Sequence, residues 1–179
     1  MTVAQPRSSA EPSAVPGVLA RSGQYLTFLL AGEEYGVDIL AVQEIRGWNP
    51  VTRIPHAPPH VEGVLNLRGA IVPIIDLRSR FGLEQIGRTP TTVVIVLSVV
   101  NKHGKRVIGA VVDKVSDVLN VPPEGIKPPP DFGSVVRTEF ILGMAALGNR
   151  MVILLDSDKL FTDGELETLD AVHRPTEGA

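Results

Sequence analysis

The fold is decided by Gly36-Val37-Asp38-Ile39-Leu40-Ala41-Val42-Gln43-Glu44-Ile45, which the chain repeats in outline as Gly109-Ala110-Val111-Val112-Asp113-Lys114-Val115-Ser116-Asp117-Val118. The two stretches are offset by 73 residues. Downstream, residues 61–81 return as residues 141–161 at an offset of 80, with Gly, Leu, Val, Asp and Phe at matching places. The change of offset indicates a seven-residue insertion in the second copy, in the proline-rich stretch 122–130. Two similar units predict two similar small barrels.

Composition limits the classes of protein that the chain can be. Hydrophobic residues make up 44% of the 179 residues and aromatic residues only 4%, so the cores are expected to be aliphatic. The net charge of −3 and the few aromatic residues argue against a nucleic-acid-binding β-barrel, which needs a basic surface and stacking platforms. Cysteine is absent, which excludes disulfides and thiol nucleophiles. No run approaches the ~18 apolar residues of a membrane span, so a cytoplasmic protein without direct membrane insertion is expected.

Short β-branched segments separated by turn residues predict an all-β protein. The expected strands cover residues 24–30, 35–38, 43–47, 63–67, 70–77, 91–99, 106–112 and 151–155. Single helical turns are expected at 39–42 and 158–161, and a final helix after Thr162 or Asp163. Residues 1–22 and 175–179 lack periodicity and are predicted to be disordered tails. The domain between them is expected to divide into a first barrel at about 31–83 and a second at about 91–160 with the N-terminal strand.

Arg68 and Gly69 are predicted to form a tight hairpin turn between two of these strands. Gly69 aligns with Asn149 in the second copy, and both residue types tolerate the positive φ of a hairpin tip. Positive φ is therefore expected at both positions.

No constellation of catalytic residues is found in the sequence. Nucleophile-elbow, phosphate-loop and dinucleotide-binding motifs are absent. His56 and His60 have the spacing of two ligands on a helix, but Pro58 and Pro59 between them exclude helical geometry, so no metal or cofactor is expected. Glu33-Glu34 is expected in an exposed, solvated turn within residues 31–34. Because Asp76 has a counterpart in Asp156, both are expected to cap the turn that follows them rather than to catalyse.

The copies differ at the hairpin turn. Asn66 and Arg68 of the first copy align with Ala146 and Gly148 of the second. A turn does not need a guanidinium, which supplies five donors suited to a carboxylate, and Glu44 is the expected acid. Arg68 and Glu44 then either shape a binding surface or form an internal ion pair that holds the hairpin, and both can hold.

Several segments together resemble one known family. Residues 34–47, the segment Val51-Thr52-Arg53-Ile54-Pro55, and above all Asn66-Leu67-Arg68-Gly69-Ala70-Ile71-Val72-Pro73-Ile74-Ile75-Asp76-Leu77-Arg78 are similar to the bacterial chemotaxis coupling proteins of the CheW family. Residues 92–97, 112–119 and 148–155 extend the likeness, which covers about residues 24–170.

The resemblance implies two intertwined five-stranded barrels of the Src-homology-3-like kind, with short helical turns and a C-terminal helix. It implies a non-catalytic adaptor, recruited to membrane-associated arrays, that joins the regulatory domain of the histidine kinase CheA to the cytoplasmic tips of methyl-accepting chemoreceptors. Carried over by position, the residues expected to bind the kinase are Ile39, Val42, Glu44, Ile45 and Gly63. Asn66 and Arg68 are expected to bind receptors, whose helices would lie in an apolar groove between the barrels.

Other interpretations remain open. The chain could be the coupling domain of a CheV-like scaffold or of the kinase itself; a free-standing adaptor is favoured because no receiver domain follows Asp170 and no ATP-binding segment precedes Gln24. An enzyme with an unrecognised site is a further alternative.

Overall fold

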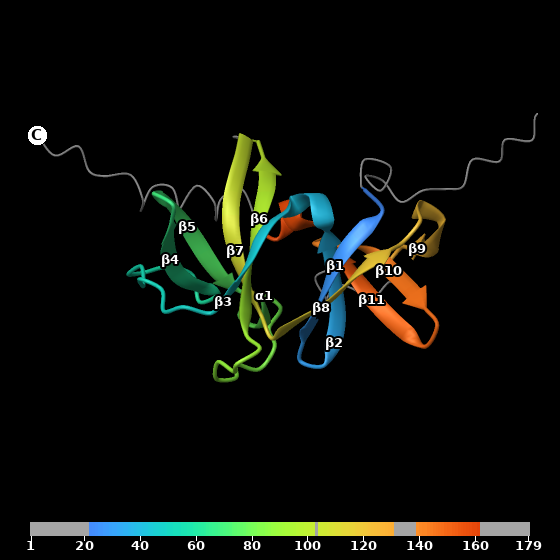
Figure 1. Ribbon diagram of the computed structural model, residues 1–179, viewed down its shortest axis with the longest axis horizontal. Helices are drawn as coiled ribbons and strands as arrows, with labels where there is room; N and C mark the ends of the chain where they lie inside the picture. Colours follow the sequence, from blue (N-terminus) through green and yellow to red (C-terminus); the bar gives the residue numbers. More distant parts are fainter. Residues whose placement is uncertain (1–21, 103, 131–138, 162–179) are drawn as a thin grey trace, which may run out of the picture.

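The computed structural model describes residues 22–102, 104–130 and 139–161, and these form two β-sheets that lie next to each other (Figure 1). The six-stranded sheet has the order β8 (Lys114–Asn120), β1 (Gln24–Leu30), β2 (Glu33–Asp38), β11 (Arg150–Leu155), β10 (Ile141–Leu147), β9 (Ile126–Lys127). The five-stranded sheet has the order β3 (Val42–Gly47), β6 (Val93–Asn101), β7 (Gly104–Val112), β5 (Ala70–Asp76), β4 (Val61–Leu67). Short helical segments are η2 (Ile39–Ala41), α1 (Leu77–Arg80), η3 (Pro123–Gly125) and η4 (Ser157–Lys159). The all-β prediction is confirmed, and β8, β9 and β10 are strands in addition to the ranges expected from the sequence.

The two sequence repeats exchange their first hairpins. β1 and β2 belong to the first repeat but lie in the sheet that holds β8, β10 and β11. β6 and β7 belong to the second repeat but lie with β3, β4 and β5. Two parallel pairings, β2 with β11 and β5 with β7, join each exchanged hairpin to its sheet. The barrels are therefore intertwined, as expected.

This exchange corrects the predicted division of the domain. The ranges 31–83 and 91–160 do not coincide with the two sheets, because β2 leaves the first range and the β6–β7 hairpin leaves the second. The N-terminal strand does lie in the sheet of the second repeat, where β1 pairs with β8. A repeat in sequence fixes which strands resemble each other, whereas which strands share a sheet depends on long-range pairing.

Irregular pairing confirms the repeat in three dimensions. β3 has an extra residue, Gln43, opposite β6, and β8 has one between Val115 and Val118 opposite β1. β4 has an extra residue, Glu62, opposite β5, and β10 has its counterpart Leu142 opposite β11. Each bulge thus recurs in the second repeat at the offset predicted from the sequence, which indicates that the bulges are regular features of the repeated unit.

The register also locates the insertion. The isolated bridge between Thr52 and Val64 corresponds to the pairing of Lys127 with Met144, an offset of 75 at Thr52. The offset therefore rises from 73 to 75 before Lys127 and from 75 to 80 after it. Most of the insertion follows β9, next to residues 131–138, which lie outside the described residues.

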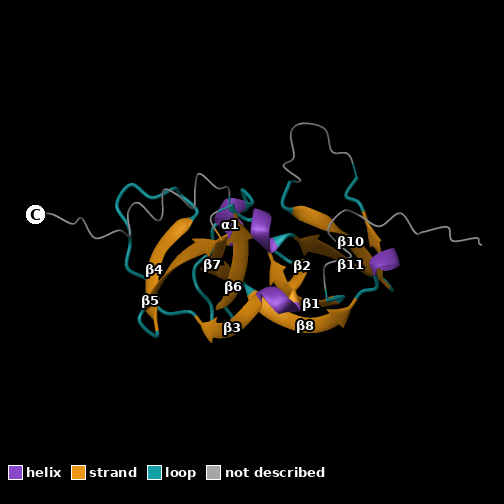
Figure 2. Cartoon of the chain, turned by 90° about the horizontal axis from the view of Figure 1, so that it is seen from above, coloured by secondary structure: helices purple, strands orange, loops and turns teal. Residues whose placement is uncertain are grey.

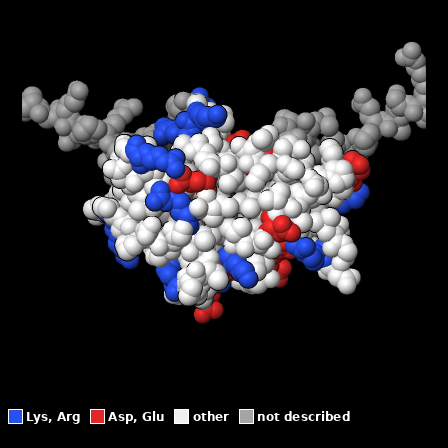
Figure 3. Space-filling model, viewed as in Figure 1, with Lys and Arg blue, Asp and Glu red and all other residues white. Residues whose placement is uncertain are grey.

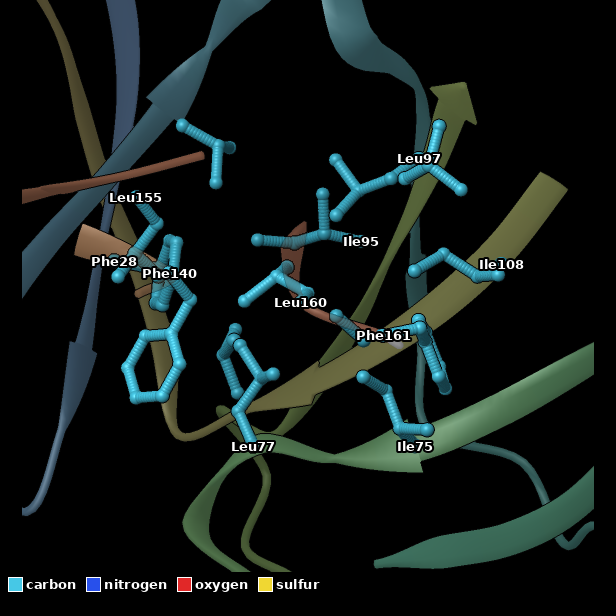
Figure 4. Close-up of a cluster of buried hydrophobic side chains, with 14 of the residues drawn as sticks. Phe28, Ile75, Leu77, Ile95, Leu97, Ile108, Phe140, Leu155, Leu160 and Phe161 are labelled. Atoms are coloured by element: carbon cyan, nitrogen blue, oxygen red, sulfur yellow. The ribbon is translucent and has the colours of Figure 1, made fainter. Parts of the chain in front are cut away.

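Three hydrophobic cores explain why several strands are continuously apolar. The largest core lies where the two sheets meet and includes Phe28 and Leu155 from one sheet and Ile75, Ile95 and Ile108 from the other (Figure 4). Each sheet also encloses a smaller core of its own. Successive side chains of a strand point to opposite faces, so β6 buries residues on both faces and reads as an unbroken apolar run. Seen from above, α1 lies between the two groups of strands (Figure 2).

Two local expectations are wrong. Glu33 and Glu34 are not in the turn, which is Ala31-Gly32 with positive φ at both residues, but begin β2. At the second hairpin the positive φ belongs to Gly148 and not to Asn149. The two hairpins therefore have different turns. The second needs positive φ only at its first turn position, where it has a glycine. The first has positive φ at both turn residues, Arg68 and Gly69.

Other local predictions are confirmed. η2 and η4 occur where helical turns are expected, and Asp76 and Asp156 each accept a hydrogen bond from the backbone N–H two residues later. The predicted tails at 1–22 and 175–179 and the final helix lie outside the described residues, except for Ser22. Within the described ranges, no helix combines the length and apolar character needed to cross a membrane.

Candidate functional site

The candidate site is built on β3, which lies at the edge of the five-stranded sheet and pairs with β6 among the described strands. Alternate residues of β3 point to opposite sides, so Glu44 and Arg46 are partly buried on one side while Ile45 is exposed on the other. Glu44 Oε1 lies 3.2 Å from Arg46 Nη1, and Glu44 Oε2 lies 2.9 Å from Arg68 Nη2. A single carboxylate thus links the edge strand to the β4–β5 hairpin.

The hairpin turn holds Arg68 away from the protein body. Gly69 N donates to Asn66 Oδ1 at 2.9 Å, which closes the turn and explains Asn66 as a local cap. Arg68 adopts a φ of 54° and its side chain is 85% exposed, despite its contact with Glu44. Ion pairs with so exposed a member contribute about 0–1 kcal/mol to folding. The Arg68–Glu44 pair therefore exists, but it is not a strong structural element.

Aliphatic residues beside this pair differ in exposure. Ile39 and Val42 are partly buried and pack against the largest core. Leu40, in η2, is 74% exposed and Ile45 is 45% exposed. In Figure 3, Lys and Arg side chains gather more over the β3–β7 half of the molecule, and the surface over β1 and η2 is mostly uncharged. Leu40 and Ile45 are thus the members of this group that expose apolar surface.

Gly63 lies in β4 beneath the backbone of Thr52 and is buried. Its φ is 152°, and a Cβ atom there would lie 2.2 Å from Thr52 O. The matching Gly143 would place a Cβ 2.5 Å from Ile126 Cγ2 and 2.8 Å from Lys127 O. The glycine is needed for close packing of backbone in both copies. A role of Gly63 in kinase binding stays a prediction, and it would act through the shape of β4.

The second copy carries a different ion pair. Arg150 donates from Nε to Glu34 Oε2 at 3.0 Å and from Nη2 to Glu34 Oε1. Hydrogen bonding to Glu34 raises the pKa of the Arg150 guanidinium above its ordinary value, and Asp117 adds to this effect. Asp117, the counterpart of Glu44, thus also interacts electrostatically with an arginine, although Arg150 comes from a different position of its hairpin than Arg68 does.

Sequence reasoning missed two members of the site. The sequence pattern favours Ile39 and Val42 over Leu40, although a three-residue turn on the surface cannot bury every side chain that it carries. Arg46 lies two residues from Glu44 on the same side of β3, and this spacing is the signal in the sequence that could have identified it. Among the residues described, no group of three or more His, Asp or Glu side chains is arranged to hold a metal ion.

Comparisons with known proteins agree with this architecture. The model of the CheW-like domain matches residues 24–165. The chain is 50% identical over 149 residues to "Chemotaxis protein CheW" of Klebsiella aerogenes, covering 83% of this chain and 87% of that protein. It is 41% identical to "Probable chemotaxis protein CheW" of Rhizobium etli, covering 80% and 90%.

A solved structure shows the same fold. The scaffolding protein TtCheW from Thermoanaerobacter tengcongensis superimposes with a TM-score of 0.71 at 34% identity, covering 79% of this chain and 94% of that one. The repeat, the exchanged hairpins and the matches over most of the chain lead to one conclusion: the chain belongs to the CheW-like domain family of chemotaxis proteins.

Proposed function

We propose that this chain is a non-catalytic adaptor that couples methyl-accepting chemoreceptors to the histidine kinase CheA in cytoplasmic signalling arrays at the membrane. The observation that carries the proposal is the combination, around one edge strand, of exposed aliphatic side chains with an exposed, pre-oriented arginine. Leu40 and Ile45 supply the apolar surface, and Arg68 is held by Glu44 at 2.9 Å. No nucleic-acid partner is proposed.

The kinase is proposed to contact η2 and β3. Binding energy at protein interfaces concentrates in a few well-packed side chains, and Leu40 and Ile45 offer such anchors without any need for the core to open. Ile39 and Val42, which are their neighbours in sequence, anchor this segment because both pack against the largest core. Glu44 takes part through its pair with Arg46 on the same strand, at 3.2 Å.

Receptors are proposed to contact the β4–β5 turn and an apolar groove between the barrels. Arg68 is suited to this role because only Nη2 is used for the pair with Glu44, and the rigid fork of a guanidinium binds carboxylates or helix-end carbonyls with several donors. Asn66 contributes by closing the turn that carries Arg68. A helix of the receptor would lie along the groove, in the manner of helix-in-groove recognition.

The kinase part of the proposal is tested by calorimetric titration with the regulatory domain of CheA. Saturable one-to-one binding is expected, and Leu40→Ser and Ile45→Ser should each weaken it about tenfold or more, since an anchor residue contributes ~1–2 kcal/mol or more. Val100→Ser is the matched control, because Val100 is a similarly exposed aliphatic residue at 52% exposure on β6 and should leave affinity within about twofold. A well-folded wild-type protein that does not bind would contradict the proposal.

The receptor part is tested by co-sedimentation with receptor cytoplasmic fragments. Arg68→Ala should reduce receptor binding while the affinity for the kinase domain and the melting temperature stay close to wild type, because the ion pair contributes so little to folding. A large loss of thermal stability in Arg68→Ala would instead assign the pair to the internal, structural alternative.

A further inference from the structure

The described chain passes from one sheet to the other at two places. The first crossing runs from β2 through η2 to β3 and carries Leu40. The second runs directly from β7 to β8 through Asp113. Each crossing is a covalent joint between the sheets, so a change in the angle between the sheets alters the backbone at or next to it.

Asp113 is bound from both sides of the second crossing. Its Oδ1 accepts from Arg78 Nε at 2.7 Å and its Oδ2 from Arg78 Nη2 at 2.5 Å. The same Oδ2 accepts from Ala31 N at 2.9 Å, in the β1–β2 turn of the other sheet. Its backbone N–H donates to Leu29 O at 3.1 Å, also in that sheet. One carboxylate therefore ties α1, at the end of β5, to the tip of the exchanged hairpin.

Arg78 is itself held firmly. Its side chain is 10% exposed, Nη1 donates to Glu84 O at 2.8 Å, and its backbone N–H donates to Asp76 Oδ1. Burial opposes ionisation of Asp113, but hydrogen bonds from Arg78 and Ala31 N outweigh it and lower the pKa of this carboxyl. Bidentate arginine–carboxylate pairs of this kind fix orientation as well as contributing energy.

The first crossing is built differently. Asp38 caps η2 by accepting from Leu40 N at 2.8 Å, and it accepts from Ser22 N at 3.1 Å. The residue that corresponds to Arg78 in the second repeat is Asp158, which accepts from Val100 N. The repeat therefore places an arginine directly after β5 and a carboxylate at the equivalent position after β11. The contact of Arg78 with Asp113, called the clamp below, therefore distinguishes the first repeat from the second.

We infer that Arg78 and Asp113 are positioning residues that fix the angle between the two sheets and thereby hold η2, with Leu40, in its binding geometry. The first step, control of the angle, stands on the contacts alone. The second step rests on the proposed function, because it assigns the Leu40 surface to the kinase.

A change in the angle is detected as a change in spin-label distances by pulsed electron–electron double resonance. A chain without cysteine is well suited to this method, because labels attach only to introduced cysteines. Spin labels on cysteines at Glu33 and Ala70, exposed residues of β2 and β5, report distances between the sheets. Labels at Lys105 and Ala70 report distances within the five-stranded sheet. Arg78→Lys keeps the charge but loses the two-pronged contact. Both this variant and Asp113→Asn should broaden the distribution of distances between the sheets and leave the distribution within the five-stranded sheet unchanged.

Arg150→Lys is the matched control. It removes the same two-pronged contact from a pair, Arg150 with Glu34, that lies within the six-stranded sheet. It should leave both distance distributions unchanged. Unaltered inter-sheet distances in both Arg78→Lys and Asp113→Asn, in folded samples, would overturn the inference, as would equal broadening in Arg150→Lys.

The same variants are then titrated with the kinase regulatory domain. Arg78→Lys should bind more weakly, by about fivefold or more, although Leu40 and Ile45 are intact, and Arg150→Lys should bind as wild type does. Broadened distances with wild-type affinity would overturn the second step. If the wild-type protein itself does not bind the kinase domain, the proposed function fails, while the distance measurement still decides the role of the clamp.

Discussion

Replacing Gly63 by alanine tests whether this glycine is required by the backbone or by a partner. The new Cβ would lie 2.2 Å from Thr52 O and 2.8 Å from Thr52 C. These are backbone atoms that cannot rotate away, and Thr52 is held to Val64 by two hydrogen bonds of 3.0 and 2.8 Å. Relief of the clash requires the segment around Thr52 to separate from β4.

The expected cost follows from these contacts. Loss of two backbone hydrogen bonds costs about 2 kcal/mol, and an alanine at a φ of 152° adds about 1–3 kcal/mol of backbone strain. The free energy of unfolding should therefore fall by about 3–5 kcal/mol. For a domain of this size each kcal/mol lowers the melting temperature by about 2–4 °C, so a decrease of roughly 10 °C is expected.

Two other glycines provide controls for thermal and denaturant unfolding. Gly69→Ala carries the cost of a positive φ but meets no atom within 4 Å, so it should cost about 1 kcal/mol. Gly47→Ala, at the end of β3, meets neither obstacle and should be close to neutral. If Gly63→Ala unfolds no more easily than Gly69→Ala, the steric reasoning is wrong. If it also loses kinase binding while fully folded, Gly63 acts in recognition after all.

Three further predictions concern the core, a bulge and the clamp. Phe140→Ala should lower the free energy of unfolding by about 3–5 kcal/mol, because Phe140 is buried and stacks on Phe81 with ring centroids 4.7 Å apart; chemical denaturation measures this, and a cost below ~1 kcal/mol would contradict it. Thr27→Val should cost about 1–3 kcal/mol, since Thr27 Oγ1 bonds both the N–H and the carbonyl of Asp117, and amide exchange at Asp117 should accelerate. The Asp113 carboxyl has a lowered pKa in the folded protein, so its stabilisation is present above its unfolded pKa of ~3.9 and is lost as pH falls below that value. The stability difference between wild type and Asp113→Asn should therefore shrink on acidification below about pH 4, and a difference that grows in this range would refute the assignment.

Much of the candidate site could be predicted because its signals are local. Asn66 and Arg68 differ from their counterparts in the second copy, and Glu44 is the acid expected to pair with Arg68. The structure places all three around one turn and one edge strand. The exposure of individual aliphatic residues could not be predicted. Whether Ile39 or Leu40 faces solvent depends on how η2 packs against a core assembled from both sheets.

The sequence by itself determined that the fold is a duplicated all-β unit, because the signals for it are local patterns. These are the strand periodicity, the turn residues, and the recurrence of Gly36 at Gly109 and of Asp76 at Asp156. The tertiary structure alone decided that the hairpins are exchanged between sheets and that Arg78 meets Asp113 across them. The physical reason is that two similar repeats offer nearly equivalent strand edges to each hairpin. Which edge is chosen depends on long-range packing, such as Ile74 against Gly109 at the β5–β7 joint, and is not encoded in any local pattern.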